Sequence, residues 1–475
     1  MLRNSRPQLD TPITKLPSIQ IARNLSREFV SLYASEISLY FKQYPPEEIE
    51  QSKSKFRFNT GILGITITSK TESSIILRAQ CKKFWKRALE KSANEDRLNH
   101  EAKNGIVGQT NLKDSTQAPQ LYCSTETLLR EQEKNNANIS ALAGQYVYNT
   151  QTGKKFPLLE IVSNKENCKI AEVYNICKSM ERLAESQGFK WLFITLTAPA
   201  QYHPNPSKGK RRYDRELGIR ASHDYIRHNW RKIRSILSYR KILASPDSYF
   251  GFRTIEPHKD GSIHWHLILF TSPQLIGEIT RAIREKFRTD IAAKIKFGRS
   301  GPDAAKASSY IFKYLRKAFS KKDTQETAED KAMDAQREAD DLASMRNRER
   351  IQAVIRAINA RQFQIFGVKN LITTFRKINS LKLDDVHPEK GSTLEYIKEK
   401  IWRNQDGYLE MLSNPELFGC NSRVSLIMEH SQNRYGEAIK KCTGIKIGDR
   451  VFPNDSIYEI KRNSVIRAEA DPEPI

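Results

Sequence analysis

Three short stretches in the middle of the chain combine β-branched and aromatic residues in the way that is typical of buried strands. They are WLFITLT at 191–197, YFGFRTIEPH at 249–258 and SIHWHLILF at 262–270. The last two stretches are separated only by a short turn containing Lys-Asp-Gly at 259–261. A turn of this composition between two strand-like segments predicts an antiparallel hairpin.

Helical spacing of apolar residues dominates elsewhere. It predicts amphipathic helices over 167–187, 222–239 and 303–319, the second with a basic face, and helical patches within 81–91 and 126–143. Residues 321–350 are so highly charged that a solvated helix or insertion is expected there. Helices around a few strands indicate an α+β fold.

The pattern predicts three regions. Residues 1–160 form a basic, mainly helical accessory region, and residues 161–380 hold the sheet and the candidate chemistry. Residues 381–475 are expected to be mainly helical and to end in a disordered tail.

Charge identifies the class of partner. Lys and Arg number 79 against 55 acidic residues, which gives a formal net charge of +24 and a pI near 9.6. Nucleic acid is the commonest partner for such a surface, because neutralising phosphates releases condensed counterions. An anionic membrane surface is the rival explanation, and it is weakened by a mean hydropathy of -0.63 and by the lack of a long apolar run.

Other common chemistries find little support in the sequence. The N-terminal residues lack the apolar segment of a secretory signal, and the six cysteines form no C-x-x-C pair, so reduced thiols are expected. No G-x-x-x-x-G-K sequence is present to bind a nucleoside triphosphate. We therefore expect that the protein does not unwind DNA by itself.

The hairpin carries a candidate metal site. Side chains alternate between the faces of a strand, so His264 and His266 share one face. If the turn is a three-residue loop with Gly261 in the left-handed conformation, Glu256 pairs with His264 and joins that face. A two-residue loop would place Pro257 opposite His264 instead. Glu256 is the preferred third ligand, with His258 as the alternative.

The donor set suits Mg²⁺ or Mn²⁺, although imidazole ligands would suit Zn²⁺ equally well. A His-x-His alternation can also arise by chance on a half-exposed strand. The neighbouring carboxylate, the apolar flank LILF and the basic chain favour the metal site over that explanation.

A second group of candidate residues lies on the predicted helix at 303–319. Helical spacing places two phenols and two ammonium groups on one stripe, and apolar residues on the opposite side. The stripe consists of Tyr310, Lys313, Tyr314 and Lys317. Because a phenol has a pKa near 10, it acts as a nucleophile at neutral pH only with the help of a base or on a strongly polarised target. Nearby lysines and a metal ion bound to a phosphate would supply that polarisation. Without the histidine hairpin, half-exposed packing residues would be the better interpretation.

Together these segments resemble the HUH endonucleases, and more closely the gene A family of bacteriophage replication proteins. The resemblance rests on ITLTAPAQYHP at 194–204, GFRTIEPHKDGSIHWHLILF at 251–270 and YIFKYLRK at 310–317. RQFQIFG at 361–367 and NRYGE at 433–437 are also similar to this family. The first 75 residues match no pattern of the family, and the charged insertion is longer than expected.

The resemblance implies an HUH endonuclease domain with a central antiparallel sheet flanked by helices, and His264 and His266 on a central strand. It also implies a function as a rolling-circle replication initiator. A bound divalent ion polarises the scissile phosphate, Tyr310 or Tyr314 attacks it, and a 5′-phosphotyrosine and a free 3′-hydroxyl result. The second tyrosine acts after one round and the displaced strand is closed. Implied partners are single-stranded origin DNA, a host helicase and the replisome in the bacterial cytoplasm, without a membrane. Candidate DNA contacts lie in the basic loop, at Lys208, Lys210, Arg211 and Arg212.

Two alternatives remain. An HUH transposase or relaxase would share the nicking chemistry and differ in substrate. A non-catalytic origin-binding protein would need basic and stacking surfaces, and it would need neither metal ligands nor paired tyrosines.

Overall fold

The computed structural model describes eleven segments of the chain: residues 27–43, 57–60, 62, 65–69, 71–108, 120–206, 210–298, 307, 347–418, 422–454 and 458–462. The chain divides into two compact units. The first comprises residues 1–104 with 429–441, and the second comprises residues 105–428 with 442–475. The predicted functional boundaries near residues 160 and 380 stay predictions, since compactness does not assign function.

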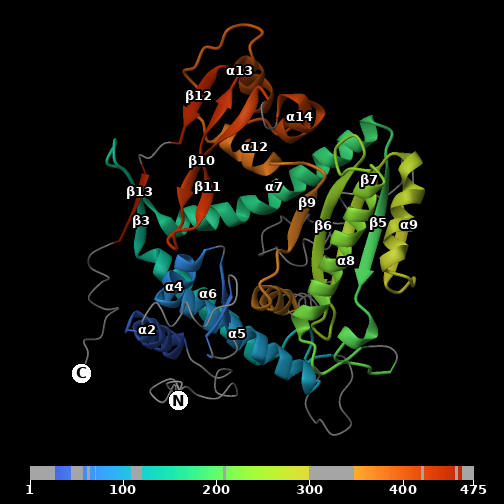
Figure 1. The fold of residues 1–475 in the computed structure, drawn as a ribbon. Helices are drawn as coiled ribbons and strands as arrows, with labels where there is room; N and C mark the ends of the chain where they lie inside the picture. Colours follow the sequence, from blue (N-terminus) through green and yellow to red (C-terminus); the bar gives the residue numbers. More distant parts are fainter. Residues whose placement is uncertain are drawn as a thin grey trace, which may run out of the picture. The chain divides into compact units, whose positions relative to one another are not determined.

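A five-stranded sheet forms the centre of the second unit, with strand order β8-β5-β7-β6-β9 (Figure 1). Every neighbouring pair in it is antiparallel. The structure therefore confirms the predicted α+β class with a central antiparallel sheet, whereas the HUH assignment stays a prediction. The strands are β5 (Lys190–Thr197), β6 (Tyr249–Pro257), β7 (Ile263–Thr271), β8 (Ala293–Phe297) and β9 (Phe363–Phe366).

The hairpin of β6 and β7 has the register expected from a three-residue loop. Glu256 pairs with His264, and the backbone N–H of His258 donates to the carbonyl of Ser262 at 2.7 Å. Gly261 has φ +85°, a left-handed conformation that glycine adopts without steric cost. The two-residue alternative, with Pro257 opposite His264, is thereby excluded.

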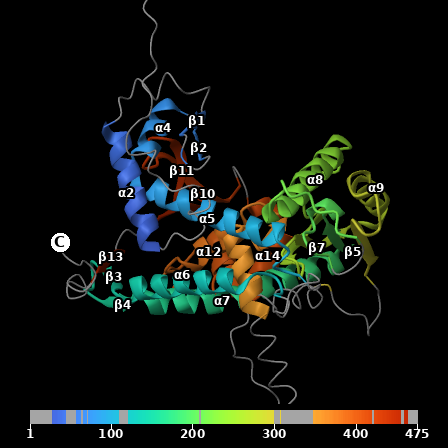
Figure 2. The ribbon, with the colours of Figure 1, turned by 90° about the horizontal axis from the view of Figure 1, so that it is seen from below.

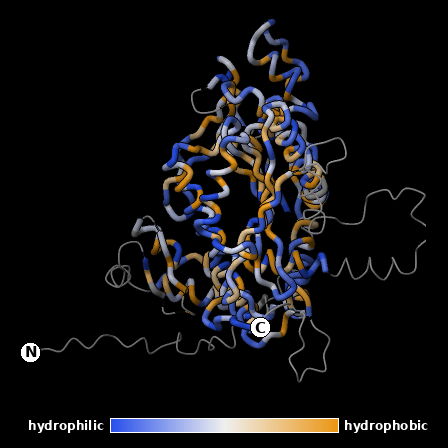
Figure 3. Tube along the Cα trace, turned by 90° about the vertical axis from the view of Figure 1, so that its right-hand side faces the viewer, coloured by the Kyte–Doolittle hydropathy of each residue, from blue (hydrophilic) through white to orange (hydrophobic). Residues whose placement is uncertain are grey.

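The alternation of β7 gives the sheet two distinct faces. We call the face of His264, His266, Ile268 and Phe270 the histidine face, and the opposite face, to which Trp265 points, the tryptophan face. All nine residues of β7 are buried, because the strand is central and helices cover the sheet on both sides. Hydrophobic residues accordingly lie mainly inside the fold (Figure 3).

Two groups of helices cover these faces. The long helix α7 (Leu158–Ser186) contributes to the same apolar cluster as Ile268 and Phe270, at the end of the histidine face away from the histidines. Helix α8 (Ile219–Tyr239) packs on β7 from the tryptophan face, and the indole Nε1 of Trp265 donates to His223 Nδ1 at 3.1 Å. Helix α9 (Ile276–Lys286) packs beside α8 (Figure 2).

The second unit contains further elements besides this sheet. A three-stranded sheet has the order β13-β3-β4, and a helix at 347–357 leads towards β9. The other elements here are η2 (Ala200–Tyr202), η3 (Pro273–Leu275), α6 (Thr125–Ala143), β3 (Gln145–Asn149), β4 (Lys155–Pro157), α12 (Leu371–Asn379), α13 (Thr393–Tyr396), the π-helix η5 (Ile397–Ile401), α14 (Gly407–Ser413) and η6 (Pro415–Leu417).

The prediction of a mainly helical C-terminal region is wrong for the described residues from 381 onwards. Short helices occupy 393–417, but four strands follow them. These strands carry many polar residues on exposed positions, so their apolar pattern is weak. They are β10 (Val424–Gln432), β11 (Ala438–Ile447), β12 (Arg450–Pro453) and β13 (Tyr458–Arg462). The tail predicted to be disordered lies outside the described residues.

The first unit has a small core of its own. The rings of Phe41 and Trp85 stack at 5.6 Å, and the indole Nε1 of Trp85 donates to the carbonyl of Ala79 at 2.6 Å. The accessory region was expected to be helical, and the elements that the structure describes for it in the first unit are helices apart from one small hairpin. Its elements are α2 (Arg27–Gln43), β1 (Arg57–Asn59), β2 (Thr66–Thr68), α4 (Glu72–Ala79) and α5 (Lys82–Lys103).

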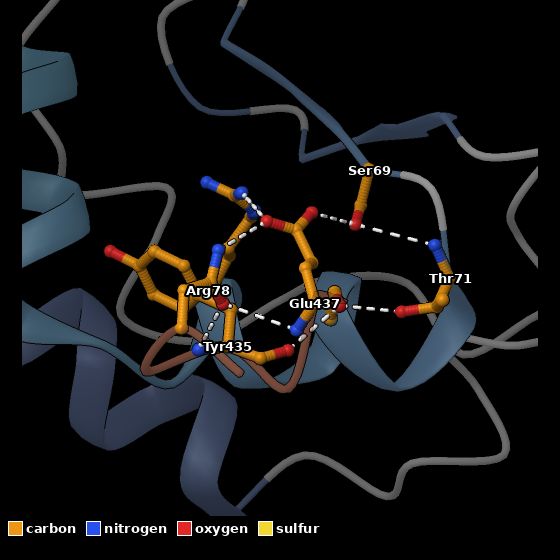
Figure 4. A network of polar contacts seen from close by, with 7 residues as sticks. Ser69, Thr71, Arg78, Tyr435 and Glu437 are labelled. Atoms are coloured by element: carbon orange, nitrogen blue, oxygen red, sulfur yellow. Dashed lines mark hydrogen bonds and ion pairs between the residues drawn. The ribbon is translucent and has the colours of Figure 1, made fainter. Parts of the chain in front are cut away.

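The NRYGE turn at 433–437 belongs to this first unit, although more than 300 residues of the chain separate it from α5 (Figure 4). The Glu437 carboxylate accepts hydrogen bonds from Ser69 Oγ at 2.6 Å and from Arg78 at 2.7 Å. The Arg78 guanidinium also lies over the Tyr435 ring at 4.2 Å. The hydrogen bonds of Ser69 and Asn433 and the charge of Arg78 lower the pKa of Glu437 to about 2.

Candidate metal centre

Three potential metal ligands meet at the end of the β6–β7 hairpin. His264 Nε2 lies 2.8 Å from His266 Nε2, and Glu256 Oε2 lies 3.1 Å from His266 Nε2 and 3.5 Å from His264 Nε2. The three residues form the one group of at least three such side chains found among the described residues. Strand alternation places the two imidazoles on one face, and the hairpin register adds the carboxylate.

These separations fit a divalent ion. An octahedral ion with bonds of about 2.1 Å holds adjacent ligand atoms about 3.0 Å apart, close to the three distances observed. Two imidazoles and one carboxylate are also a donor set that Mn²⁺ and Zn²⁺ accept. Three protein ligands leave coordination positions open, as a catalytic site requires.

Thr195 on β5 orients one of the imidazoles. Its Oγ1 lies 3.1 Å from His266 Nδ1, so a proton on Nδ1 leaves the lone pair of Nε2 directed at the cluster. On the other side of His266, Thr254 pairs in register, but its buried Oγ1 has no hydrogen-bond partner among the described residues. Only one of the two flanking threonines therefore supports the imidazole.

His258, the alternative ligand, lies beside the cluster. Its ring centroid is 4.1 Å from that of His264, and its buried Nε2 has no partner in the described part of the chain. Burial and the neighbouring His264 and His203 hold the pKa of His258 far below its usual value, so the ring is neutral. It is outside the group of three described above, but it adds a third imidazole beside the cluster.

A polar network fixes the turn that joins the two strands. Ser262 Oγ donates to Asp260 Oδ1 at 2.6 Å and lies 2.9 Å from His203 Nδ1. Burial alone would lower the pKa of His203, but the adjacent Asp260 carboxylate outweighs it and raises that pKa. His203 also contacts the carbonyl of Ala198 through Nε2 at 3.0 Å. His203 thus ties the loop after β5 to the hairpin turn, which is a structural role.

Tyr122 lies against the same turn and carries no signal in the sequence. Its backbone N–H donates to the carbonyl of Lys259 at 2.9 Å, and its own carbonyl lies 3.0 Å from where a Cβ on Gly261 would be. Tyr122 has φ +69°, a conformation that costs a non-glycine residue roughly 1 kcal/mol or more. Burial and the charge of Glu256 raise the pKa of its phenol.

Comparison with known proteins places this chain in a family. The family model described as bacteriophage replication gene A protein matches residues 64–408, which is most of the chain and includes the whole central sheet. This chain belongs to that family. No solved structure matches it.

Curated members of the gene A family and related replication proteins share part of their length with the chain. The replication gene A protein of Escherichia phage P2 is 30% identical over 215 residues, covering 41% of this chain and 28% of the relative. The probable replication protein P12 of Pseudoalteromonas phage PM2 is 28% identical over 51% of this chain and 37% of its own length. A probable replication endonuclease from a prophage-like region of Salmonella typhimurium is 25% identical over 52% and 30%.

The chain therefore matches only about a third of the length of these relatives. Among the described residues, no helix is both long enough and apolar enough to cross a membrane.

The structure describes only some of the predicted site residues. Glu256, His264 and His266 come together. Lys210, Arg211 and Arg212 are exposed in the segment before α8. Five predicted residues lie outside the described residues: Lys208, Tyr310, Lys313, Tyr314 and Lys317. Ala307, three positions before Tyr310, is described as helical and fully buried, in the apolar cluster that includes Ile268 and Phe270.

Proposed function

We propose that this member of the gene A family is a metal-dependent endonuclease with an HUH-type domain, which initiates rolling-circle replication. It nicks one strand at an origin and remains attached to the new 5′ end. The observation that carries the proposal is the convergence of Glu256, His264 and His266 at ligand distances on the histidine face. A divalent ion held by these residues, Mg²⁺ or Mn²⁺, would polarise the scissile phosphate.

The nucleophile in this proposal is Tyr310 or Tyr314. A bond forms between the phenolic oxygen and phosphorus while the bond from phosphorus to the 3′ oxygen breaks, so the departing 3′ oxygen takes up a proton and the phenol loses one. The predicted helical spacing places Lys313 and Lys317 on the same stripe as the two tyrosines, where their ammonium groups can neutralise phosphate charge.

The same mechanism accounts for the end of a round. The second phenol attacks the regenerated origin, and the free 3′-hydroxyl attacks the first phosphotyrosine, which closes the displaced strand. A strand with a free 3′-hydroxyl can be extended by a polymerase. We therefore expect origin DNA, a host helicase and the replisome as partners in the cytoplasm of a bacterial host. Lys208, Lys210, Arg211 and Arg212 are proposed contacts to the DNA backbone.

A nicking assay tests this proposal. Single-stranded origin DNA labelled at the 3′ side of the nick should yield a protein-linked product with Mn²⁺, and none with a chelator. The double variant Tyr310→Phe, Tyr314→Phe should lose the product. Tyr239→Phe is the matched control, because Tyr239 ends α8, a helix that packs on the tryptophan face, and is 89% exposed.

The alternatives give different outcomes in this assay. Retarded migration of DNA without cleavage would support a non-catalytic origin-binding protein. Cleavage followed by joining to unrelated target DNA would support a transposase, and nicking confined to a transfer origin would support a relaxase. A product that survives in the double tyrosine variant would rule out the proposed nucleophiles.

A further inference from the structure

The edge strand β8 carries two lysines on the face of the sheet that holds the metal centre. Thr195 on β5 pairs with His266 on one side and with Lys294 on the other. In the next row on this face, Phe193 pairs with both Ile268 and Lys296. Directly paired residues of antiparallel strands project from the same face. Lys294 and Lys296 therefore project from the histidine face.

Both lysines are exposed, and the residues that alternate with them along β8 project from the opposite face. Ala293 is fully buried and Ile295 is half-buried on the tryptophan face. Neither lysine forms an ion pair with a carboxylate within the part of the chain that the structure describes. The β8 edge of the histidine face therefore carries two positive charges, one in the row of His266 and one in the next row.

A different explanation exists for lysines on an edge strand. Natural sheets often carry lysine at an edge because its charge prevents pairing with another chain. That role requires only that the edge strand is charged. It does not require a lysine in the same row as the metal ligand His266. The two explanations make different predictions for DNA binding, which allows a direct test.

We propose that Lys294 and Lys296 bind backbone phosphates of the DNA strand, which crosses β5 from the metal centre to the edge at β8. This inference rests on the proposed function, because it takes the scissile phosphate to lie at the centre. Neighbouring strands are about 4.8 Å apart, so the Cα atoms of Lys294 and His266 lie about 10 Å apart. At about 3.4 Å per nucleotide, the contacted phosphates lie within about three nucleotides of the scissile one.

The salt dependence of binding measures such contacts. Each phosphate contact contributes about 0.7 to the slope of log K against log salt concentration for a single strand. The full chain is titrated with a fluorescent single-stranded origin oligonucleotide in EDTA, so that no cleavage occurs. Removing two contacts in Lys294→Ala, Lys296→Ala should lower the slope by about 1.4, which weakens binding about 25-fold at 0.1 M salt.

The double variant Lys390→Ala, Lys400→Ala is the matched control. It removes the same charge from two exposed lysines, Lys390 in the loop before α13 and Lys400 in η5, and its slope should remain that of the unaltered protein. The variant Lys294→Arg, Lys296→Arg should restore the slope, because it keeps both charges. Thermal melting of all variants separates loss of contacts from loss of folding.

An unchanged slope in the β8 alanine variant overturns the inference, and so does an equal decrease in the control. Failure of the unaltered chain to bind the strand also overturns it. Because binding is measured without cleavage, the proposed function is tested separately. A lower slope in the β8 alanine variant, together with no nicking by the unaltered chain in Mn²⁺, would support the DNA path and refute the endonuclease. Nicking by the unaltered chain, together with an unchanged slope in the variant, would support the endonuclease and refute the DNA path.

Discussion

The substitution Thr195→Val isolates the support that β5 gives to the metal centre. Valine keeps the branched shape of threonine but removes Oγ1, which lies 3.1 Å from His266 Nδ1. Without that partner, the proton of the imidazole is no longer held on Nδ1, and it can occupy Nε2, the atom that faces Glu256 and His264. A proton on Nε2 blocks metal binding.

The expected loss is considerable for one hydroxyl group. Removing a partner that orients a metal ligand typically weakens metal affinity 10- to 100-fold, which corresponds to about 1.4–2.7 kcal/mol. Leaving a buried N–H without a partner also costs about 1–3 kcal/mol of folding stability. We therefore expect Thr195→Val to bind Mn²⁺ at least 10-fold more weakly and to unfold at lower denaturant concentration.

The assay is a calorimetric titration of the full chain with Mn²⁺ at fixed pH, and the control is Thr254→Val. Thr254 pairs with His266 from the other side, but its Oγ1 makes no hydrogen bond among the described residues. This control should bind Mn²⁺ as the unaltered protein does and should be as stable or slightly more stable. If Thr195→Val binds within twofold of the unaltered protein, or if both variants lose affinity equally, the reasoning about the imidazole is refuted.

Three further predictions follow from other parts of the structure. His264→Ala should abolish cleavage while DNA affinity changes less than threefold, because the basic surfaces are separate from the metal ligands; equal losses in nicking and anisotropy assays would contradict this. Gly367→Ala should lower the free energy of unfolding by at least about 2 kcal/mol, since Gly367 has φ +84° and a Cβ would lie 2.5 Å from Phe250 Cβ. Gly188→Ala, with φ +68° but nothing within 4 Å, should cost only the backbone strain of about 1 kcal/mol in the same denaturant titration. Glu437→Gln should destabilise the protein at pH 7, and because the pKa of Glu437 is lowered to about 2, the difference in unfolding free energy from the unaltered protein should shrink as the pH falls from about 5 through about 2; a difference at pH 2 as large as that at pH 7 would refute the assignment.

The local parts of the site were predictable from the sequence. The period of the strand fixes which side chains share a face. The Lys-Asp-Gly turn favoured the register that places Glu256 beside His264 over the two-residue alternative, and the observed strand pairing confirms it. The helical patterns around Trp85 and Trp230 likewise correspond to α5 and α8. In each case the information lies within about twenty consecutive residues.

Contacts between distant segments were not predictable in this way. No local pattern in the sequence shows that β5 pairs with β7. The support from Thr195 and the alignment of Lys294 with His266 are therefore seen only in the assembled sheet. The backbone of Tyr122 docks on the hairpin turn through tertiary contacts as well. Strands β10 to β13 were missed because half-exposed strands with mixed polar residues show little periodicity.

The central claim is that a phenol of this chain attacks a phosphate held at the histidine face. Its most direct test is to incubate the full chain with origin DNA and Mn²⁺, digest the covalent product and identify the nucleotide-bearing peptide by mass spectrometry. The account predicts that the nucleotide is attached to Tyr310 or Tyr314. Attachment to any other residue, or free DNA ends with no attached peptide, would contradict it.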